Sequence, residues 1–426
     1  MFKLIFLLCL PILFYSQNSV ANKVDVVWTG FSINADYKDL EISAYYTNKL
    51  LKRYSSTQNI IDKTLKNEIN LNNFNHINLL TGTEQLSDET SKIAMSVFLD
   101  QELFEEFRLP DEDCKKINLP ECYIYSFNNY YQIIFFDFEK MTFLKAVPFQ
   151  NIIISDPLSK LNDDQKVDLL EKFYTNSNWL KGFSNNQLND ENTISFIDIL
   201  KNIQINQFYD TYIGVNPNKN GFSINKDKVG DLIPDYIFEN IHLLKRHVAN
   251  TFLGELALKN NLVIVPYFEG FGIGNKIRGK YANREEAYEI TIPEPDFYID
   301  VKIRGFVKKK FKEDENVEDL TWYIYGSGIN LKFYEPLLNK VYLDIKMTKA
   351  DFKKIPNILN LNKTNEFVNI INLTYRPLAI EFSDIVNNNK NSKDINDWLK
   401  KITKNSSNID DIVEFRKFVD RIKSTQ

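Results

Sequence analysis

Hydrophobic residues occupy every second position in three runs of the chain, over residues 297–303, 329–333 and 341–347. Charged, polar and tyrosine residues fill the positions between them. A period of two directs alternate side chains to opposite faces, so each run predicts a strand with one buried face. The turn at residues 335–340 (E-P-L-L-N-K) joins the last two runs into a predicted hairpin.

Shorter apolar runs predict further strands. These cover residues 24–31, 76–80, 122–127, 131–138, 143–149, 208–215 and 262–267. The turn Glu139–Met141 makes residues 131–149 a second predicted hairpin. Residues 269–287 are rich in glycine and charge, and they predict a loop.

Apolar residues three or four positions apart predict helices. The expected helices cover residues 39–54, 58–71, 87–107, 163–174, 194–203 and 241–256. Ser87 as N-cap, with Asp88 and Glu89 in the first turn, favours the third of these. From Lys349 onward, helical segments are expected to alternate with polar breaks.

These elements predict an α+β fold with two tandem αβ domains, each a mixed or antiparallel sheet packed with helices. The polar, turn-rich residues 175–192 separate the two halves. We expect a first domain over residues 22–192, a second over residues 193–386, and a linker and helical C-terminal tail over residues 387–426.

The two halves have a similar order of parts. Each has a strand, a long amphipathic helix, a short strand, a strand that opens with an acidic and an aromatic residue, and a hairpin. Residues 121–124 in the first half correspond to residues 296–299 in the second. The predicted helix at 87–107 interrupts the match. Two unrelated domains could share this order, but the agreement of the hairpins favours a duplication.

The N-terminus has the pattern of a secretory signal peptide: Lys3, an apolar run over residues 4–15, and a small-x-small cleavage site at residues 19–21. We expect cleavage after Ala21. An uncleaved anchor is the alternative, although the run is shorter than the roughly 20 residues that span a bilayer. We therefore expect an exported protein, periplasmic or secreted, with no transmembrane span after cleavage.

Removal of the signal peptide leaves two cysteines, Cys114 and Cys122. An even pair in an exported chain predicts one short-loop disulfide. Two unpaired thiols remain an alternative, and a metal site is disfavoured because no histidine lies nearby in the sequence.

The composition excludes several classes of function. Hydrophobic residues make up 43% of the 426 residues, charged residues 26%, and the net charge is −5 without a long basic tract, so we expect no nucleic acid partner. His242 and His247 lie five positions apart on a predicted helix and cannot share a metal ion as an i,i+4 pair could. His76 begins an apolar run. We expect no metal, no cofactor and no catalytic triad.

Two pairs of carboxylates could in principle hydrolyse a glycosidic bond. Asp137 and Glu139 lie two positions apart, and Asp296 and Asp300 four apart, so each pair could share a face of a strand. The first pair leads into a turn, where acidic residues are common for backbone reasons. We therefore expect no catalytic residues.

The glycine-rich segment 270–279 lacks the Gly-Lys-Ser/Thr ending of a phosphate-binding loop and runs into polar residues rather than a helix. It predicts either a flexible loop or an interaction loop. In the second case, four residues would contact an acidic partner: Lys276, Lys280, Tyr281 and Arg284.

A second candidate for partner binding is the basic run Lys308, Lys309 and Lys310, which precedes the acidic residues 313–315 at an expected hairpin tip. Opposite charges this close largely cancel beyond a Debye length of about 8 Å. The run therefore predicts either a solvated tip or a contact for anionic lipid or glycan.

Three motifs resemble a known family: V-I-V-P-Y at 263–267, P-E-P-D-F-Y-I-D-V-K-I at 293–303, and L-K-F-Y-E-P-L-L-N-K-V-Y at 331–342. They are similar to the periplasmic αβ domain of CsgG, the curli secretion-channel protein. They also resemble the N-terminal domain of TolB and the middle domain of the flagellar protein FlgT. Residues 336–340 replace the Thr-Gly turn of those families, and the chain has no CsgG-like transmembrane hairpins or lipid-anchor cysteine in its sequence.

Together these observations predict an exported, non-enzymatic structural or adaptor component of a bacterial cell-envelope assembly. Its partners would be envelope proteins or a second copy of itself. The contacts are expected at the hairpins of the second half, at the loop 269–287, or at strand edges through β-augmentation. One alternative is an exported, carboxylate-dependent hydrolase that acts on glycan or peptidoglycan. Another is a secreted factor that acts on a host.

Overall fold

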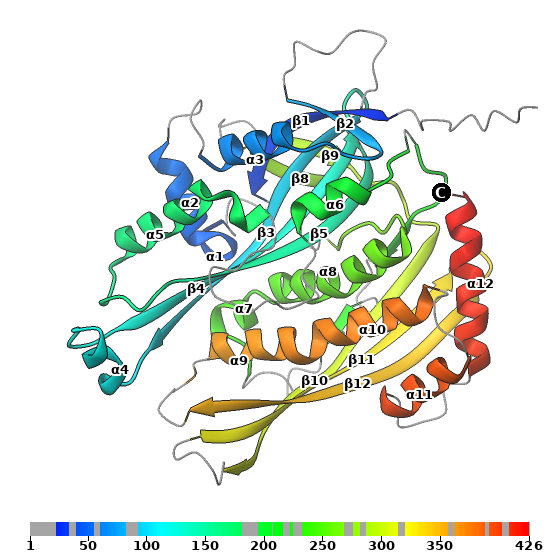
Figure 1. Ribbon diagram of the computed structural model, residues 1–426. Helices are drawn as coiled ribbons and strands as arrows, with labels where there is room; N and C mark the ends of the chain where they lie inside the picture. The colour runs from blue at the N-terminus through cyan, green and yellow to red at the C-terminus, as the bar shows by residue number, and fades with distance from the viewer. Residues whose placement is uncertain are drawn as a thin grey trace, which may run out of the picture.

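The computed structural model describes residues 23–33, 40–54, 60–81, 93–180, 195–206, 208–215, 222–224, 232–267, 276–281, 287–313, 320–356, 361, 363–387, 392–402 and 409–425. Over these residues the chain has an α+β fold with a helical C-terminal region, as predicted. Its elements form four layers, in which helices cover the first sheet, and further helices lie between that sheet and the second (Figure 1). The predicted signal peptide lies outside the described residues.

The first sheet has seven strands in the order β2-β1-β3-β4-β5-β9-β8. Strand β1 (Val24–Ile33) is parallel to β2 (Ile77–Leu80) and to β3 (Ile93–Arg108). Strands β3, β4 (Tyr123–Asp137) and β5 (Thr142–Ile154) form an antiparallel meander. Most residues of β3 and β4 are buried on both faces.

A hairpin from the second half of the chain completes this first sheet. Strands β8 (Lys276–Tyr281) and β9 (Ala287–Thr291) pair with each other, β9 pairs with β5 through Thr291 and Thr142, and β8 pairs with the end of β1. The sheet thereby closes on itself. The prediction of a loop over residues 269–287 is wrong in its described part. Residues 276–281 form β8 and residue 287 begins β9, and these strands also pair with β1 and β5, which lie more than 100 positions away.

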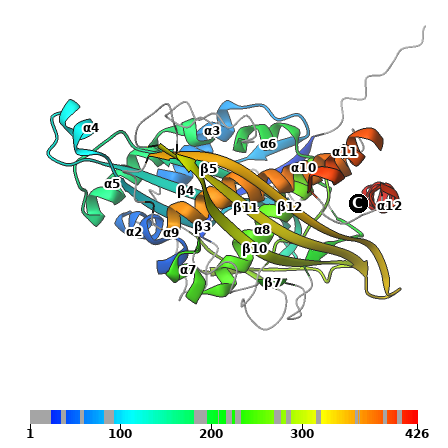
Figure 2. The same ribbon diagram turned by 90° about the horizontal axis from the view of Figure 1, so that it is seen from below.

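The second sheet has the strand order β12-β11-β10-β6, and β7 also pairs with β10. Strands β10 (Phe297–Glu313), β11 (Leu320–Glu335) and β12 (Lys340–Pro356) form an antiparallel meander, and the short strands β6 (Ile213–Val215) and β7 (Phe222–Ile224) are parallel to β10. The period-two pattern is confirmed, since the apolar positions face the helices. Figure 2 shows this sheet from below.

The helices divide between two hydrophobic cores. Those of the first half are α1 (Leu40–Ser43), α2 (Tyr45–Arg53), α3 (Ile60–Leu71), α4 (Asp111–Lys116), α5 (Asp163–Thr175), η2 (Ser177–Leu180) and α6 (Phe196–Asn202). Those of the second are α7 (Asp235–Glu239), α8 (Ile241–Asn260), α9 (Lys363–Ile370), the π-helix η5 (Ile371–Tyr375), α10 (Arg376–Val386), α11 (Ser392–Ile402) and α12 (Ile409–Thr425). Phe415 of α12 packs on Phe333 of β11, so the C-terminal helix belongs to the second core.

The two sheets share one strand order. In the first it is β2-β1-β3-β4-β5. In the second, Ile264 forms a parallel bridge with Ile213 of β6, and β6 is followed by β10, β11 and β12. Helices connect the first strand to the short second one in both halves. This equivalence of topology favours the predicted duplication.

The helix predicted over residues 87–107 is wrong. Its described part is strand β3, and residues 82–92 lie outside the described residues. The segment is buried on both faces because helices pack on both sides of the sheet, so its pattern does not alternate. Two smaller expectations are also corrected: β4 is one strand where two were expected, and β12 extends to Pro356, past the expected helical region at Lys349.

Candidate functional site

Charged side chains join the first sheet to helix α8. Arg246 of α8 pairs with Asp100 of β3, with 3.2 Å between Nε and Oδ1, and donates a hydrogen bond from Nη2 to the backbone oxygen of Asp100 at 2.8 Å. Asn250, one turn along α8, donates to Oδ2 of Asp100 at 3.2 Å. Arg246 is only 2% exposed, so removal of either partner would leave a buried, unpaired charge.

A second ion pair lies on the same interface. Arg376, at the start of α10, pairs with Glu255 of α8 at 2.8 Å and donates to the side-chain oxygen of Gln150 on β5 at 3.1 Å. Arg376 therefore connects α8, α10 and the first sheet.

His247 follows Arg246 on α8 and is fully buried. Its ring packs against Tyr130 with 4.2 Å between centroids, and against Phe367 at 5.7 Å. Burial, and secondarily the charge of Arg246, lowers the pKa of His247 to about 3. The imidazole is therefore neutral at physiological pH and forms part of the packing between the halves.

A cavity of about 40 Å³ lies between these groups. Its lining includes both carboxylates, Asp100 and Glu255, together with Tyr130, Gln132 and His247. Tyr130 Oη, Gln132 Oε1 and His247 Nε2 have no hydrogen-bond partner among the described residues. A water molecule needs about 10–15 Å³ of such space, so the cavity can hold a few waters that bridge these atoms.

Two buried carboxylates on one cavity are the arrangement that a glycosidase would need. Ligand pockets, however, measure about 300–1,000 Å³, several times the volume of this one. Each carboxylate is also bound by an arginine. As the cavity stands, it can accommodate water but not a sugar ring.

Three of the four carboxylates named from the sequence, Asp137, Asp296 and Asp300, accept hydrogen bonds from nearby groups. Asp137 Oδ1 accepts hydrogen bonds from the backbone nitrogens of Glu139 and Lys140, at 3.0 and 2.9 Å, and so stabilises the β4–β5 turn. Asp296 Oδ2 accepts from the backbone nitrogen of Tyr212 at 2.9 Å, and Asp300 from the hydroxyl of Tyr334 at 3.2 Å.

Glu102 of β3 lies on the opposite side of the first sheet and binds the N-terminus of α2. Its carboxylate accepts hydrogen bonds from the backbone nitrogens of Tyr46 and Thr47, at 2.8 and 3.1 Å, and from the Thr47 hydroxyl at 2.6 Å. Burial raises the pKa of Glu102 to about 7, and these hydrogen bonds oppose the shift only in part. Sequence reasoning missed this group because it placed residue 102 on a helix.

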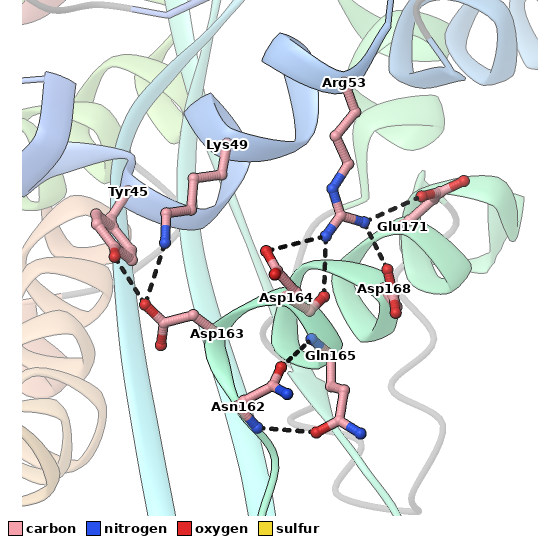
Figure 3. A network of polar contacts seen from close by, with 9 residues as sticks. All are labelled: Tyr45, Lys49, Arg53, Asn162, Asp163, Asp164, Gln165, Asp168 and Glu171. Atoms are coloured by element: carbon pink, nitrogen blue, oxygen red, sulfur yellow. Dashed lines mark hydrogen bonds and ion pairs between the residues drawn. The ribbon is translucent and has the colours of Figure 1, made fainter.

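Polar contacts also attach α2 to α5 (Figure 3). Lys49 and the hydroxyl of Tyr45 both bind Asp163 Oδ2, at 3.1 and 2.8 Å, and Arg53 pairs with Asp168. The hydrogen bond from Tyr45 and that from Lys49 lower the pKa of Asp163. Asn162 and Gln165 form a capping box at the start of α5. These are exposed, helix-joining contacts with a structural role.

The structure does not bring the two groups of candidate partner-binding residues together, since they lie on different sheets. Lys276 pairs with Glu289 at 2.7 Å within the β8–β9 hairpin, the backbones of Lys280 and Tyr281 pair with β1, and Arg284 lies outside the described residues. On β10, Lys308 pairs with Glu366 of α9, Lys310 pairs with Glu313 at 2.7 Å, and Lys309 is exposed on the opposite face.

Cys114 and Cys122 form the predicted disulfide. It links α4 to the start of β4 at the end of the β3–β4 hairpin, with a Cα–Cα distance of 5.4 Å. Neither cysteine therefore remains as a thiol.

No family model matches the chain, and no curated protein matches it. Among solved structures, the chain is similar to a minor lipoprotein from Acinetobacter baumannii, with 9% identity, a TM-score of 0.20, and coverage of 39% of this chain and 92% of the lipoprotein. At that TM-score the likeness supports no argument about fold or function. The resemblance to the CsgG, TolB and FlgT domains is not confirmed by these comparisons and stays a prediction.

Among the described residues, no helix combines the length and the apolar character needed to cross a bilayer. Within the same residues, no cluster of histidine, cysteine and acidic side chains could hold a metal ion.

Proposed function

We propose that this protein is an exported, non-enzymatic structural or adaptor component of a bacterial cell-envelope assembly that acts by protein–protein contacts. The signal-peptide pattern supports export. So does the disulfide between Cys114 and Cys122, because disulfides persist in oxidising compartments. The proposed location is the periplasm, with secretion as the alternative.

The main structural support for this proposal is the turn between β11 and β12. Leu337 is 89% exposed and Leu338 68%. The backbone nitrogen of Asn339 donates to the oxygen of Pro336 at 3.2 Å, and Asn339 has a φ of 47°, so the turn is tight and presents both leucines at its corner. Two adjacent large apolar side chains on such a turn suit a pocket on a partner protein better than they suit water.

The test is cross-linking and copurification of the tagged chain from its native envelope. We expect the wild type to retain a defined set of envelope proteins and the L337S/L338S variant to lose at least one of them. Leu71 and Phe208, which are 77% and 70% exposed, provide a matched control, and the L71S/F208S variant should keep every partner. Equal recovery of partners with the wild type and the L337S/L338S variant would contradict the proposal.

The alternative function, a glycan or peptidoglycan hydrolase, is motivated by Asp100 and Glu255 on one cavity. It requires a second state in which the cavity is wide enough to admit a sugar ring. Release of soluble fragments from purified peptidoglycan by the wild type, lost in the E255Q variant, would support this alternative. If the wild type releases no more fragments than buffer alone, the hydrolase alternative is excluded.

A further inference from the structure

The face of β10–β12 that points away from the helices is basic. The register places seven cationic side chains on it or in its bulges: Lys302, Arg304, Lys309, Lys312, Lys332, Lys346 and Lys354. Two acidic residues, Asp300 and Asp344, share the face. The seven cations and two acids give this surface, which we call the outer face, a net positive charge, whereas the whole chain has a net charge of −5.

The opposite face of the same strands is covered. Phe306 packs on Phe367 of α9, Lys308 pairs with Glu366, and Phe333 packs on Phe415 of α12. Of the described helices, α11 reaches the edge of the outer face, where the hydroxyl of Thr348 donates to the backbone oxygen of Ile402 at 3.0 Å. Lys302, Lys309, Lys312, Lys346 and Lys354 are nevertheless exposed, and Figure 2 shows the three strands at the side of the molecule away from the first sheet. The outer face is therefore available to a ligand that lies outside the molecule.

Apolar side chains gather at the far end of the outer face. Val307, Phe311 and Phe352 are 53%, 55% and 48% exposed, and the rings of Phe311 and Phe352 meet edge to face with 5.2 Å between centroids. Ile324 lies between Lys309 and Phe352 in the register, and the ammonium of Lys354 lies 4.5 Å from the ring centre of Trp322. Exposed rings among lysines are typical of side chains that sit at a membrane interface.

Gly328 lets an arginine lie on the outer face near its centre. A Cβ at Gly328 would come within 3.4 Å of Arg304 Nη2, and that nitrogen donates to the backbone oxygen of Met347 at 2.9 Å. The guanidinium is thereby held against the sheet. Charges spread over three neighbouring strands can contact a broad anionic surface.

The lysine content of the outer face distinguishes between a protein partner and a membrane partner. The centres of protein–protein interfaces are depleted in lysine, whereas anionic headgroups attract lysines without requiring fixed geometry. Six of the seven cationic residues named above are lysines. We propose that the outer face docks on the surface of an anionic bilayer, with Val307, Phe311 and Phe352 entering the headgroup region. This lipid contact is distinct from the protein contact proposed for Leu337 and Leu338.

The experiment is sedimentation of the purified chain from residue 22 with vesicles. One set contains phosphatidylcholine alone, and the other contains equal parts of phosphatidylcholine and phosphatidylglycerol. We expect binding only to the anionic set, with an affinity that falls as salt rises. The variant K309E/K312E/K354E should bind at least about 100-fold more weakly, since each lysine near an anionic surface accounts for about a fivefold change in affinity.

Lys52, Lys63 and Lys115 are exposed lysines of the first half and give a matched control. The variant K52E/K63E/K115E has the same net charge as the test variant and should bind anionic vesicles like the wild type. L337S/L338S should also bind normally, so a failure of the proposed protein contact is separable from a failure here. Equal loss in both lysine variants, equal binding to both vesicle sets, or pelleting without vesicles would overturn the proposal; the last would indicate self-association instead.

Discussion

Three acidic residues of strand β3 illustrate how individual side chains join parts of this molecule. Asp100 binds Arg246 of α8, Glu102 binds the first turn of α2, and Glu105 accepts hydrogen bonds from Asn128 and from Asn365 of α9. All three are buried. Burial of a carboxylate is unfavourable unless several donors surround it, so each of these residues specifies where its partner element must lie.

The Asp100–Arg246 pair gives a direct test at this scale. We expect R246M to lower the free energy of unfolding by about 3–5 kcal/mol, because Asp100 would stay buried without its cation. Denaturant unfolding measures the change. The double variant R246M/D100L removes both charges and should recover most of the loss. The exposed pair Lys116–Asp113 is the control, and K116M should leave the free energy of unfolding nearly unchanged. Equal costs for R246M and K116M would contradict the role given to the buried pair.

Glu102 predicts a pH dependence of stability. Its pKa is about 7 in the folded protein, above the value of about 4.3 for an unfolded glutamate. Between these values the folded state keeps a proton that the unfolded state releases, so the stabilisation is complete below about pH 4.3 and is lost as the pH rises through 7. A shift of this size is worth on the order of 3 kcal/mol.

The comparison with E102Q isolates this effect. Glutamine keeps an acceptor for the α2 amides but cannot titrate, so the unfolding free energy of E102Q should change less between pH 5 and pH 8 than that of the wild type. Denaturant unfolding at several pH values measures both slopes. If the two slopes are the same, Glu102 does not titrate in this range in the folded protein.

At the scale of elements, the sequence predicted strands where only one face is buried. Residues 297–303, 329–333 and 341–347 were placed correctly, as was the turn after Glu335, because strict alternation reflects one apolar and one polar face. Strand β3 was taken for a helix, since helices cover both faces of its sheet and the alternation disappears. Strands β8 and β9 were missed because the segment around them is rich in glycine and charge, although the two strands pair with each other. The buried ion pairs could not be predicted because their partners lie far apart in the chain: Asp100 and Arg246 are 146 positions apart.

Helix α8 packs against β5 at a distance that only glycine permits. A Cβ at Gly254 would lie 2.0 Å from Cγ of Pro148, whose ring cannot rotate away. On an isolated helix, alanine is favoured over glycine by about 1 kcal/mol. At position 254 we expect glycine to be favoured instead, so G254A should lower the free energy of unfolding by about 1–3 kcal/mol through overpacking. Denaturant unfolding of G254A, P148A and the double variant would show whether P148A relieves the cost. A stabilised G254A would mean that the two elements are not in close contact.

At the scale of the whole molecule, the two halves repeat a topology, and each of the two cores contains residues from both halves. The β8–β9 hairpin follows α8 in the chain yet packs in the first core, where Ile277, Tyr288 and Ile290 are buried. The hydroxyl of Tyr288 bonds Ser32 at 3.0 Å and Ser96 at 3.1 Å. Leu103 and Tyr130 of the first half pack in the second core. Each half therefore contributes residues that the other needs.

This sharing predicts that the chain unfolds as one cooperative unit. A fragment of residues 22–206 would lack the hairpin and expose Phe98 and Phe136, which pack against Tyr288 with ring centres 5.8 and 6.1 Å away. Far-ultraviolet circular dichroism and tryptophan fluorescence of the whole chain should give coincident denaturant transitions. The fragment should be sensitive to protease at concentrations that leave the whole chain intact. Two separate transitions, with the fragment reproducing one of them, would show instead that the first half folds without the hairpin and that the predicted boundary near residue 192 divides two independent domains.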